Sequence, residues 1–142
     1  MLHEVVAAMI TRSQRILLGL RSVNREYYPG VWDVFGGHVE PGERREQTLL
    51  RELREELGIL PVQWTYLETI TDPPISHPQN PAEQLIMHLY LVTEWTGTPE
   101  NVQPEEHSAI GWFSLAEAVR LPLLHPSYPK LFERYLSVDL KK

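Results

Sequence analysis

Residues 37–59 read Gly-His-Val-Glu-Pro-Gly-Glu-Arg-Arg-Glu-Gln-Thr-Leu-Leu-Arg-Glu-Leu-Arg-Glu-Glu-Leu-Gly-Ile. The part 43–57 contains neither Gly nor Pro and is rich in Glu, Arg, Gln and Leu, which favour helices. Gly58 follows at the position where a left-handed residue commonly ends a helix. The buried face is predicted from the leucines at helical spacing, which are Leu49, Leu50, Leu53 and Leu57. The stretch therefore predicts an amphipathic helix over 43–57.

Three carboxylates share one side of this predicted helix. Glu52, Glu55 and Glu56 stand at positions i, i+3 and i+4, next to the leucine stripe. Clustered carboxylates repel one another, and Mg²⁺ or Mn²⁺ relieves this repulsion by binding through carboxylates and substrate phosphates. A solvated acidic face is the common alternative for a Glu-rich helix. The glycines at 36, 37 and 42 favour the metal site, because they let the backbone approach a ligand closely.

The stretch resembles the Nudix hydrolases. It matches their pattern G-x5-E-x7-R-E-U-x-E-E-x-G-U, with U aliphatic, at Gly37, Glu43, Arg51, Glu52, Leu53, Glu55, Glu56, Gly58 and Ile59. The likeness continues in Trp32-Asp33-Val34-Phe35-Gly36-Gly37, Trp95-Thr96-Gly97-Thr98-Pro99 and Trp112-Phe113-Ser114. It implies an α/β (α+β) fold, an α/β/α sandwich around a central mixed β-sheet. It also implies hydrolysis of a nucleoside diphosphate linked to another group, with Mg²⁺ or Mn²⁺ as the cofactor.

The resemblance implies roles for individual residues. Glu43 and Arg51 are expected to form a salt bridge that organises the loop against the helix. Glu52 and Glu56 are expected to be the main metal ligands. Glu52 is also the expected general base, and its two roles compete. Further metal ligands are expected from Glu55 and the backbone carbonyl of Gly36.

A further acid is expected from the segment Gln103-Pro104-Glu105-Glu106-His107. Resemblance to MutT-like enzymes points to Glu106 as an additional metal ligand, with Glu105 as the alternative and a solvated acidic loop as the ordinary explanation. His107 is expected to be structural or exposed. The candidate substrate contacts are Arg25, Tyr28, Phe35 and His38. An arginine side chain is suited to binding phosphate. The rings of Tyr27, Tyr28 and Phe35 are suited to stacking on a base, and the alternative is that they pack in the core or at the pocket rim. Phe35 stands where MutT relatives commonly have Pro.

Composition limits the other classes of function. We expect 142 residues to form a single domain, 1–142. The net charge of −6 argues against a nucleic-acid polymer as partner, whereas a small-molecule nucleotide can bind through divalent cations. No apolar run is long enough to span a membrane. The absence of cysteine and of a secretion signal favours a cytoplasmic location. The sequence is compatible with a homodimer but does not determine the oligomeric state.

The rest of the chain predicts short elements. Apolar runs predict strands at 4–11, 15–21, 31–35, 62–71, 84–94 and 110–113. Four prolines predict an irregular loop over 72–81. A capping box at Ser114 predicts a short helix to about residue 120, and Pro126 suits the start of a terminal helix to about residue 138.

Three functions are compatible with these features. The first is a MutT-type nucleoside triphosphate pyrophosphohydrolase. The second is an ADP-ribose or nucleotide-sugar pyrophosphatase, indicated by Pro74, fifteen residues past the motif. The third is a ligand-sensing module without turnover, against which the intact set of acids argues. By alignment, the Asn with which MutT reads its base falls at Leu124, so weak discrimination between bases is expected.

Overall fold

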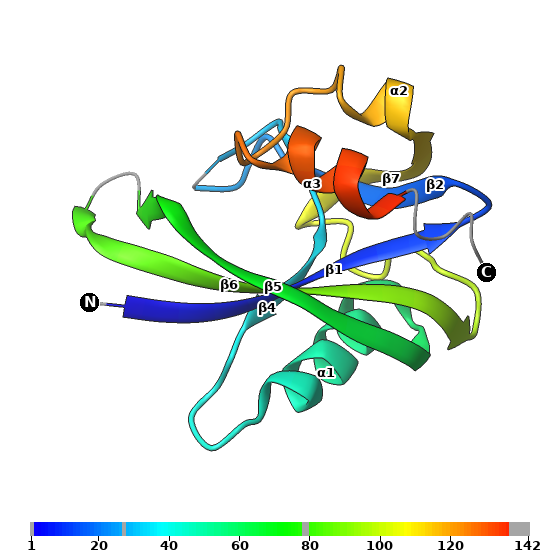
Figure 1. The fold of residues 1–142 in the computed structure, drawn as a ribbon, viewed down its shortest axis with the longest axis horizontal. Helices are drawn as coiled ribbons and strands as arrows, with labels where there is room; N and C mark the ends of the chain where they lie inside the picture. The colour runs from blue at the N-terminus through cyan, green and yellow to red at the C-terminus, as the bar shows by residue number, and fades with distance from the viewer. Residues whose placement is uncertain (1, 27, 78–79, 137–142) are drawn as a thin grey trace.

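The computed structural model describes residues 2–26, 28–77 and 80–136 (Figure 1). The strands are β1 (Leu2–Arg12), β2 (Arg15–Arg21), β3 (Trp32–Asp33), β4 (Phe35–His38), β5 (Leu60–His77), β6 (Asn80–Thr96) and β7 (His107–Ser114). The helices are α1 (Arg45–Leu57), α2 (Leu115–Ala118) and α3 (Tyr128–Leu136). The sheet order is β3-β2-β1-β6-β5, with β4 paired to β1 and β7 paired to β2. Because β1 runs parallel to β6 and the other pairs are antiparallel, the sheet is mixed, as predicted.

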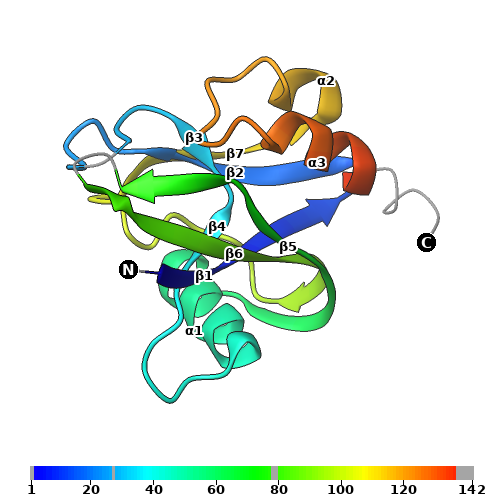
Figure 2. The ribbon, with the colours of Figure 1, turned by 60° about the vertical axis from the view of Figure 1, so that its left-hand side comes forward.

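Helices cover both faces of this sheet (Figures 1 and 2). Figure 2 shows α1 on one side and α2 with α3 on the other. Successive residues of β1 point to opposite faces. Val5 and Ala7 therefore pack with the core under α3, while Val6 and Ala8 pack with the core under α1. This confirms the predicted α/β/α sandwich. No helix in the described part of the chain is long and apolar enough to cross a membrane.

The strands β3 and β4 fill the space where β1 and β2 separate. β1 pairs with β2 beside their connecting turn, and farther along β1 pairs with β4 at Val5 to Ala8. β3 pairs with Gly19 and Leu20 of β2. The prediction of one strand over 31–35 is therefore wrong, because its two halves pair with different neighbours. This crossing brings the backbone of β4 against α1.

Helix α1 follows its sequence pattern closely. Leu49, Leu53 and Leu57 are completely buried, whereas Leu50 is half-buried at the edge of the stripe. The helix ends at Gly58, whose φ of 70° is left-handed and whose N–H donates to the Arg54 carbonyl at 3.0 Å. The predicted helix end is confirmed, and the observed helix begins at Arg45 because residues 39–44 form the preceding loop.

The segment 72–81 is largely strand, so the predicted irregular loop is wrong. β5 continues to His77, and β6 begins at Asn80. The ladder between them shifts register, and residues 71–74 and 81–83 are bulged out of it. Three of the four prolines lie in these bulges, where no ladder hydrogen bond is lost, and Pro78 lies outside the described residues.

Helix α2 is shorter than predicted, and α3 begins later than predicted. Ser114 and Glu117 form the predicted capping box, with each side chain accepting from the backbone N–H of the other. α3 begins at Tyr128, two residues after Pro126, and places Leu131 in the core. The predicted end of this helix, at about residue 138, lies outside the described residues. α3 matters for function because its first residue, Tyr128, contributes to the pocket described next.

Candidate active site

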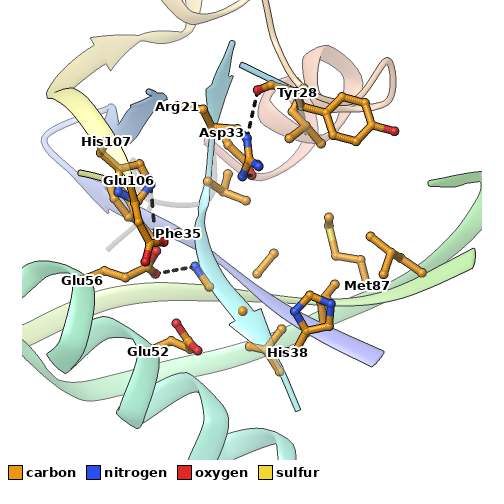
Figure 3. Close-up of a pocket in the computed structure, with 18 of the residues that line it drawn as sticks. Arg21, Tyr28, Asp33, Phe35, His38, Glu52, Glu56, Met87, Glu106 and His107 are labelled. Carbon is orange, nitrogen blue, oxygen red and sulfur yellow. Dashed lines mark hydrogen bonds and ion pairs between the residues drawn. The ribbon is translucent and has the colours of Figure 1, made fainter. Parts of the chain in front are cut away.

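A pocket with a volume of about 560 Å³ lies between α1, the β1–β4 face of the sheet, and the segment that precedes β7. One end carries carboxylates and the other is largely apolar. Figure 3 shows Glu52, Glu56 and Glu106 together on one side of β4 and Met87 on the other. The pocket therefore joins an acidic compartment to a recess that accepts an apolar or aromatic group.

Glu56 is the most buried of the acids. Its exposed fraction is 6%, and the Gly36 N–H donates to its Oε1 atom at 3.0 Å. Its Oε2 atom lies 3.9 Å from His107 Nε2. Burial raises the pKa of Glu56 well above its usual value, and the neighbouring Glu52 raises it further. The protein thus holds a carboxylate where its negative charge lacks full compensation, which is a location suited to a cation.

Two glycines let the acids reach the backbone of β4. A Cβ atom at position 37 would stand 2.4 Å from the Glu52 carboxyl group. Gly36 has a φ of 155°, and a Cβ atom there would stand 1.8 Å from the Val6 carbonyl oxygen. Any side chain at either position would displace the strand or the acid. The two glycines therefore permit a close approach of β4 to Glu52 and to β1.

Arg51 organises the carboxylates of the helix and the preceding loop. It donates from Nε to Glu43 Oε2 at 2.7 Å, so the predicted salt bridge is confirmed. Its NH1 atom donates to Glu52 Oε1 at 2.8 Å and to Glu55 Oε1 at 3.0 Å. The pKa of Glu43 falls to about 2, chiefly through the hydrogen bond from Arg51 and then that from Thr48. Burial raises the pKa of Glu52, and Arg51 opposes this shift.

Glu106 reaches the same compartment from the segment before β7. It lines the pocket, and its charge raises the pKa values of Glu52 and Glu56. Glu105 is exposed and is not one of the residues that line the pocket. Arg25, the predicted phosphate contact, lies 3.4 Å from Glu106 Oε1 through its NH1 atom. The geometry thus brings Glu106, rather than Glu105, to the acidic cluster.

The donor set fits a divalent cation. Carboxylate and carbonyl oxygens are the ligands of Mg²⁺ and Mn²⁺. Among residues 2–26, 28–77 and 80–136, no three acidic or histidine side chains already stand together in ligating positions. Glu52 Oε1 accepts from Arg51 NH1 and Glu56 Oε1 accepts from the Gly36 N–H, and each carboxylate has a second oxygen.

The predicted substrate contacts differ in their surroundings. His38 is exposed and Tyr28 half-buried, and both line the pocket. Phe35 also lines it, but its exposed fraction is 1% and its ring lies 5.2 Å from that of His107. Its ring packs in the core under α1, which is the predicted alternative to stacking on a base. Tyr27 lies outside the described residues.

The sequence analysis assigned no role to two polar residues of the pocket, Asp33 and Tyr128. Asp33 ends β3 and accepts a hydrogen bond at 2.7 Å from the hydroxyl of Tyr128, which begins α3. Asp33 is the one charged residue in the apolar run 31–35, and this was a signal that it could have a role in a site. Its distance of 95 positions from Tyr128 left no local pattern that links the two. His107, expected to be structural or exposed, is buried beside Glu56.

Known proteins resemble this chain in sequence and architecture. A profile of the NUDIX domain matches residues 1–135. The CTP pyrophosphohydrolase of Escherichia coli K12 is 38% identical over 136 residues, covering 95% of this chain and 92% of that protein. The nucleoside triphosphatase NudI of Escherichia coli K12 is 32% identical over 129 residues, covering 85% and 88%.

A solved structure agrees with these relatives. The crystal structure of the MutT NUDIX hydrolase from Burkholderia pseudomallei has a TM-score of 0.82 and 31% sequence identity. The match covers 95% of this chain and 98% of that one. The matching profile spans nearly the whole chain, and the relatives are more than 30% identical along most of their length. The chain therefore belongs to the Nudix family of hydrolases.

Proposed function

We propose that this chain is a single-domain nucleoside triphosphate pyrophosphohydrolase, which releases a nucleoside monophosphate and pyrophosphate. The observation that carries the proposal is the pocket, in which a cluster of carboxylates, one of them the buried Glu56, adjoins an apolar recess. Its volume of about 560 Å³ lies within the range of small-molecule sites. The names of the two curated relatives, a CTP pyrophosphohydrolase and a nucleoside triphosphatase, support the same substrate class.

The acidic compartment is where we place the phosphates. Nudix hydrolases generally use a divalent cation, usually Mg²⁺, which neutralises phosphate charge and lowers the pKa of an attacking water. Glu52, Glu56 and Glu106, with the Gly36 carbonyl, are the oxygens of this chain that we expect to hold it. Glu52 is the proposed proton acceptor in any state in which its carboxylate is not a ligand. Arg51 holds Glu52 in place, because its NH1 atom is 2.8 Å from Glu52 Oε1.

The two alternative functions have weaker support. The ADP-ribose hypothesis rests on Pro74, which belongs to a bulged part of β5. A sensor without turnover would not need Glu52, Glu55 and Glu56 kept on one helix beside a pocket. The names of the two curated relatives favour a nucleoside triphosphate over both alternatives.

A substrate panel tests the proposal. The purified chain is incubated with Mg²⁺ and each of the four ribonucleoside triphosphates, the four deoxy forms and ADP-ribose, and the products are identified by anion-exchange chromatography. A parallel series in excess chelator is the control. We expect monophosphate and pyrophosphate from several triphosphates, and no products in chelator. Rapid cleavage of ADP-ribose with no triphosphate turnover would replace the proposal by the nucleotide-sugar alternative, and no turnover of any substrate would favour the sensor.

A further inference from the structure

Asp33 is a carboxyl group placed among the apolar residues of the recess. Its side chain is 19% exposed, and it lines the pocket. The apolar lining comes from Val5, Ala7, Leu85, Met87 and Leu124. A carboxylate is costly to hold in such surroundings, and burial raises the pKa of Asp33 from its usual value. Figure 3 shows Asp33 beside Arg21 and away from Glu52.

Tyr128 fixes the orientation of this carboxyl group. The Tyr128 hydroxyl donates to Asp33 Oδ1 at 2.7 Å. Its other polar neighbour is the Met87 sulfur at 4.0 Å, a weak acceptor, so the phenolic hydrogen is directed to Asp33. The Oδ2 atom lies 4.0 Å from Arg21 NH1, which is beyond hydrogen-bond distance. The Val34 backbone N–H also donates to the carboxyl group. A carboxylate has about four acceptor sites, so acceptor capacity for a ligand remains.

We propose that Asp33 reads the base of the nucleotide, with its Oδ2 atom accepting a hydrogen bond from an exocyclic amino group. This inference rests on the proposed function and names its preferred substrate class, nucleotides whose base carries an amino group. The 4-amino group of cytosine can donate a hydrogen bond to the Oδ2 atom of Asp33. The 4-oxo group of uracil or thymine is itself an acceptor. It cannot donate to Asp33, so both oxygens would lack a hydrogen-bond partner in the recess.

CTP and UTP are the matched pair of substrates, because they share the sugar and the triphosphate and differ in the pyrimidine edge. We expect kcat/KM for CTP to exceed that for UTP by about ten- to a hundredfold, which is the discrimination that a carboxylate gives by accepting from the amino group of cytosine. The ratio is measured over a series of pH values, because burial raises the pKa of Asp33 and the ionised, accepting form gains population as the pH rises. A ratio within about twofold of one would overturn the proposal.

The variant Asp33→Asn tests the contact because it should reverse the preference between CTP and UTP. The Tyr128 hydroxyl donates to the amide oxygen of the variant, as it does to Oδ1 now, and this leaves the amide nitrogen at the position of Oδ2. The reading atom is thereby changed from an acceptor to a donor. We expect the CTP to UTP ratio to fall below one, with kcat/KM for UTP rising. A ratio unchanged from the parent protein would overturn the assignment of Asp33.

Two further variants separate base reading from loss of structure. Tyr128→Phe in the Asp33→Asn background removes the group that orients the amide, and we expect a ratio near one. Glu68→Gln is the matched control, because Glu68 also accepts from a tyrosine hydroxyl, that of Tyr135, in a separate cleft beside α3. We expect this control to keep the parent ratio. The same shift in the control would mean that Asp33 acts through general stability.

Binding of the products keeps this inference distinct from the proposed function. If no triphosphate is hydrolysed, the proposed function fails, and the base contact is then tested by the Kd values of CMP and UMP in the presence of Mg²⁺. Tighter binding of CMP, reversed by Asp33→Asn, would support base reading by itself. Equal Kd values for CMP and UMP would overturn it.

Discussion

Arg51 Nε lies 2.7 Å from Glu43 Oε2, and this contact links the loop before α1 to the second turn of the helix. The Arg51 NH2 atom also donates to the Glu43 Oε1 atom at 3.0 Å and to the His38 carbonyl at 3.1 Å. The pair is bidentate, and both side chains are largely covered, with exposed fractions of 20% and 15%. Such a pair fixes geometry more firmly than an exposed one.

Arg51→Gln is expected to lower kcat at least tenfold, the usual cost of losing a residue that orients metal ligands. The physical reason is that Glu43, Glu52 and Glu55 all lose their shared partner. The thermal midpoint is also expected to fall. Steady-state kinetics and calorimetry check the two effects, with Arg54→Gln, at an exposed position of the same helix, as the control. Full activity in the Arg51 variant would contradict an organising role.

Glu56→Gln is expected to abolish most of the hydrolysis and to raise the stability of the metal-free protein at neutral pH. A carboxyl whose folded pKa is raised stabilises the fold below its unfolded pKa and loses this contribution as the pH rises through the folded value. The amide removes that loss and still accepts from the Gly36 N–H. Urea unfolding in chelator measures stability. Unchanged turnover in the variant would contradict the metal assignment.

Glu52→Gln is expected to lower kcat by about a hundredfold or more, the size expected for a positioned base or an essential ligand. A titration with Mn²⁺ separates the two roles, because loss of a ligand weakens ion binding whereas loss of a base does not. The glutamine keeps an oxygen for the Arg51 NH1 atom, so the loop should stay ordered. Parent values of both kcat and Mn²⁺ affinity would contradict both roles.

Glu106→Gln is expected to reduce kcat about tenfold to a hundredfold, as is usual for a supplementary ligand. Glu105→Gln is its matched control, one residue away but exposed and outside the pocket lining. Steady-state kinetics of both variants at saturating Mg²⁺ makes the comparison. A silent Glu106 variant with a damaged Glu105 variant would show that the acid is misplaced by one residue.

His107 is expected to make the fold sensitive to acid. Burial, followed by the charges of Arg25 and Arg21, lowers the pKa of His107 from 6.5 to about 4. A histidine with a lowered folded pKa contributes stability above pH 6.5 that is lost as the pH falls through about 4. The free energy of unfolding should therefore decline less over this window in His107→Gln than in the parent protein.

Urea unfolding of the metal-free protein at several pH values measures this difference. The raised pKa values of Glu52 and Glu56 act in the opposite sense, so the difference between the two proteins is the informative quantity. Equal pH slopes in the two proteins would contradict the assignment to His107.

The sequence by itself determined helix α1 and the placement of its acids. The period of Leu49, Leu53 and Leu57 and the glycine at 58 are local signals, because helix geometry relates residues three and four apart. The same geometry placed Glu52 and Glu56 on one side. The motif also predicted the pairing of Glu43 with Arg51, which the structure confirms.

Only the tertiary structure decided what surrounds that helix. Pro73, Pro74 and Pro81 fit the strands because the β5–β6 ladder is bulged at these positions. Phe35 is buried because β4 crosses between β1 and β2. Asp33 meets Tyr128 through chain folding across 95 positions. Local sequence patterns predict contacts within one helix or strand. These features depend instead on which distant segments pack together, and burial of the whole core determines that packing.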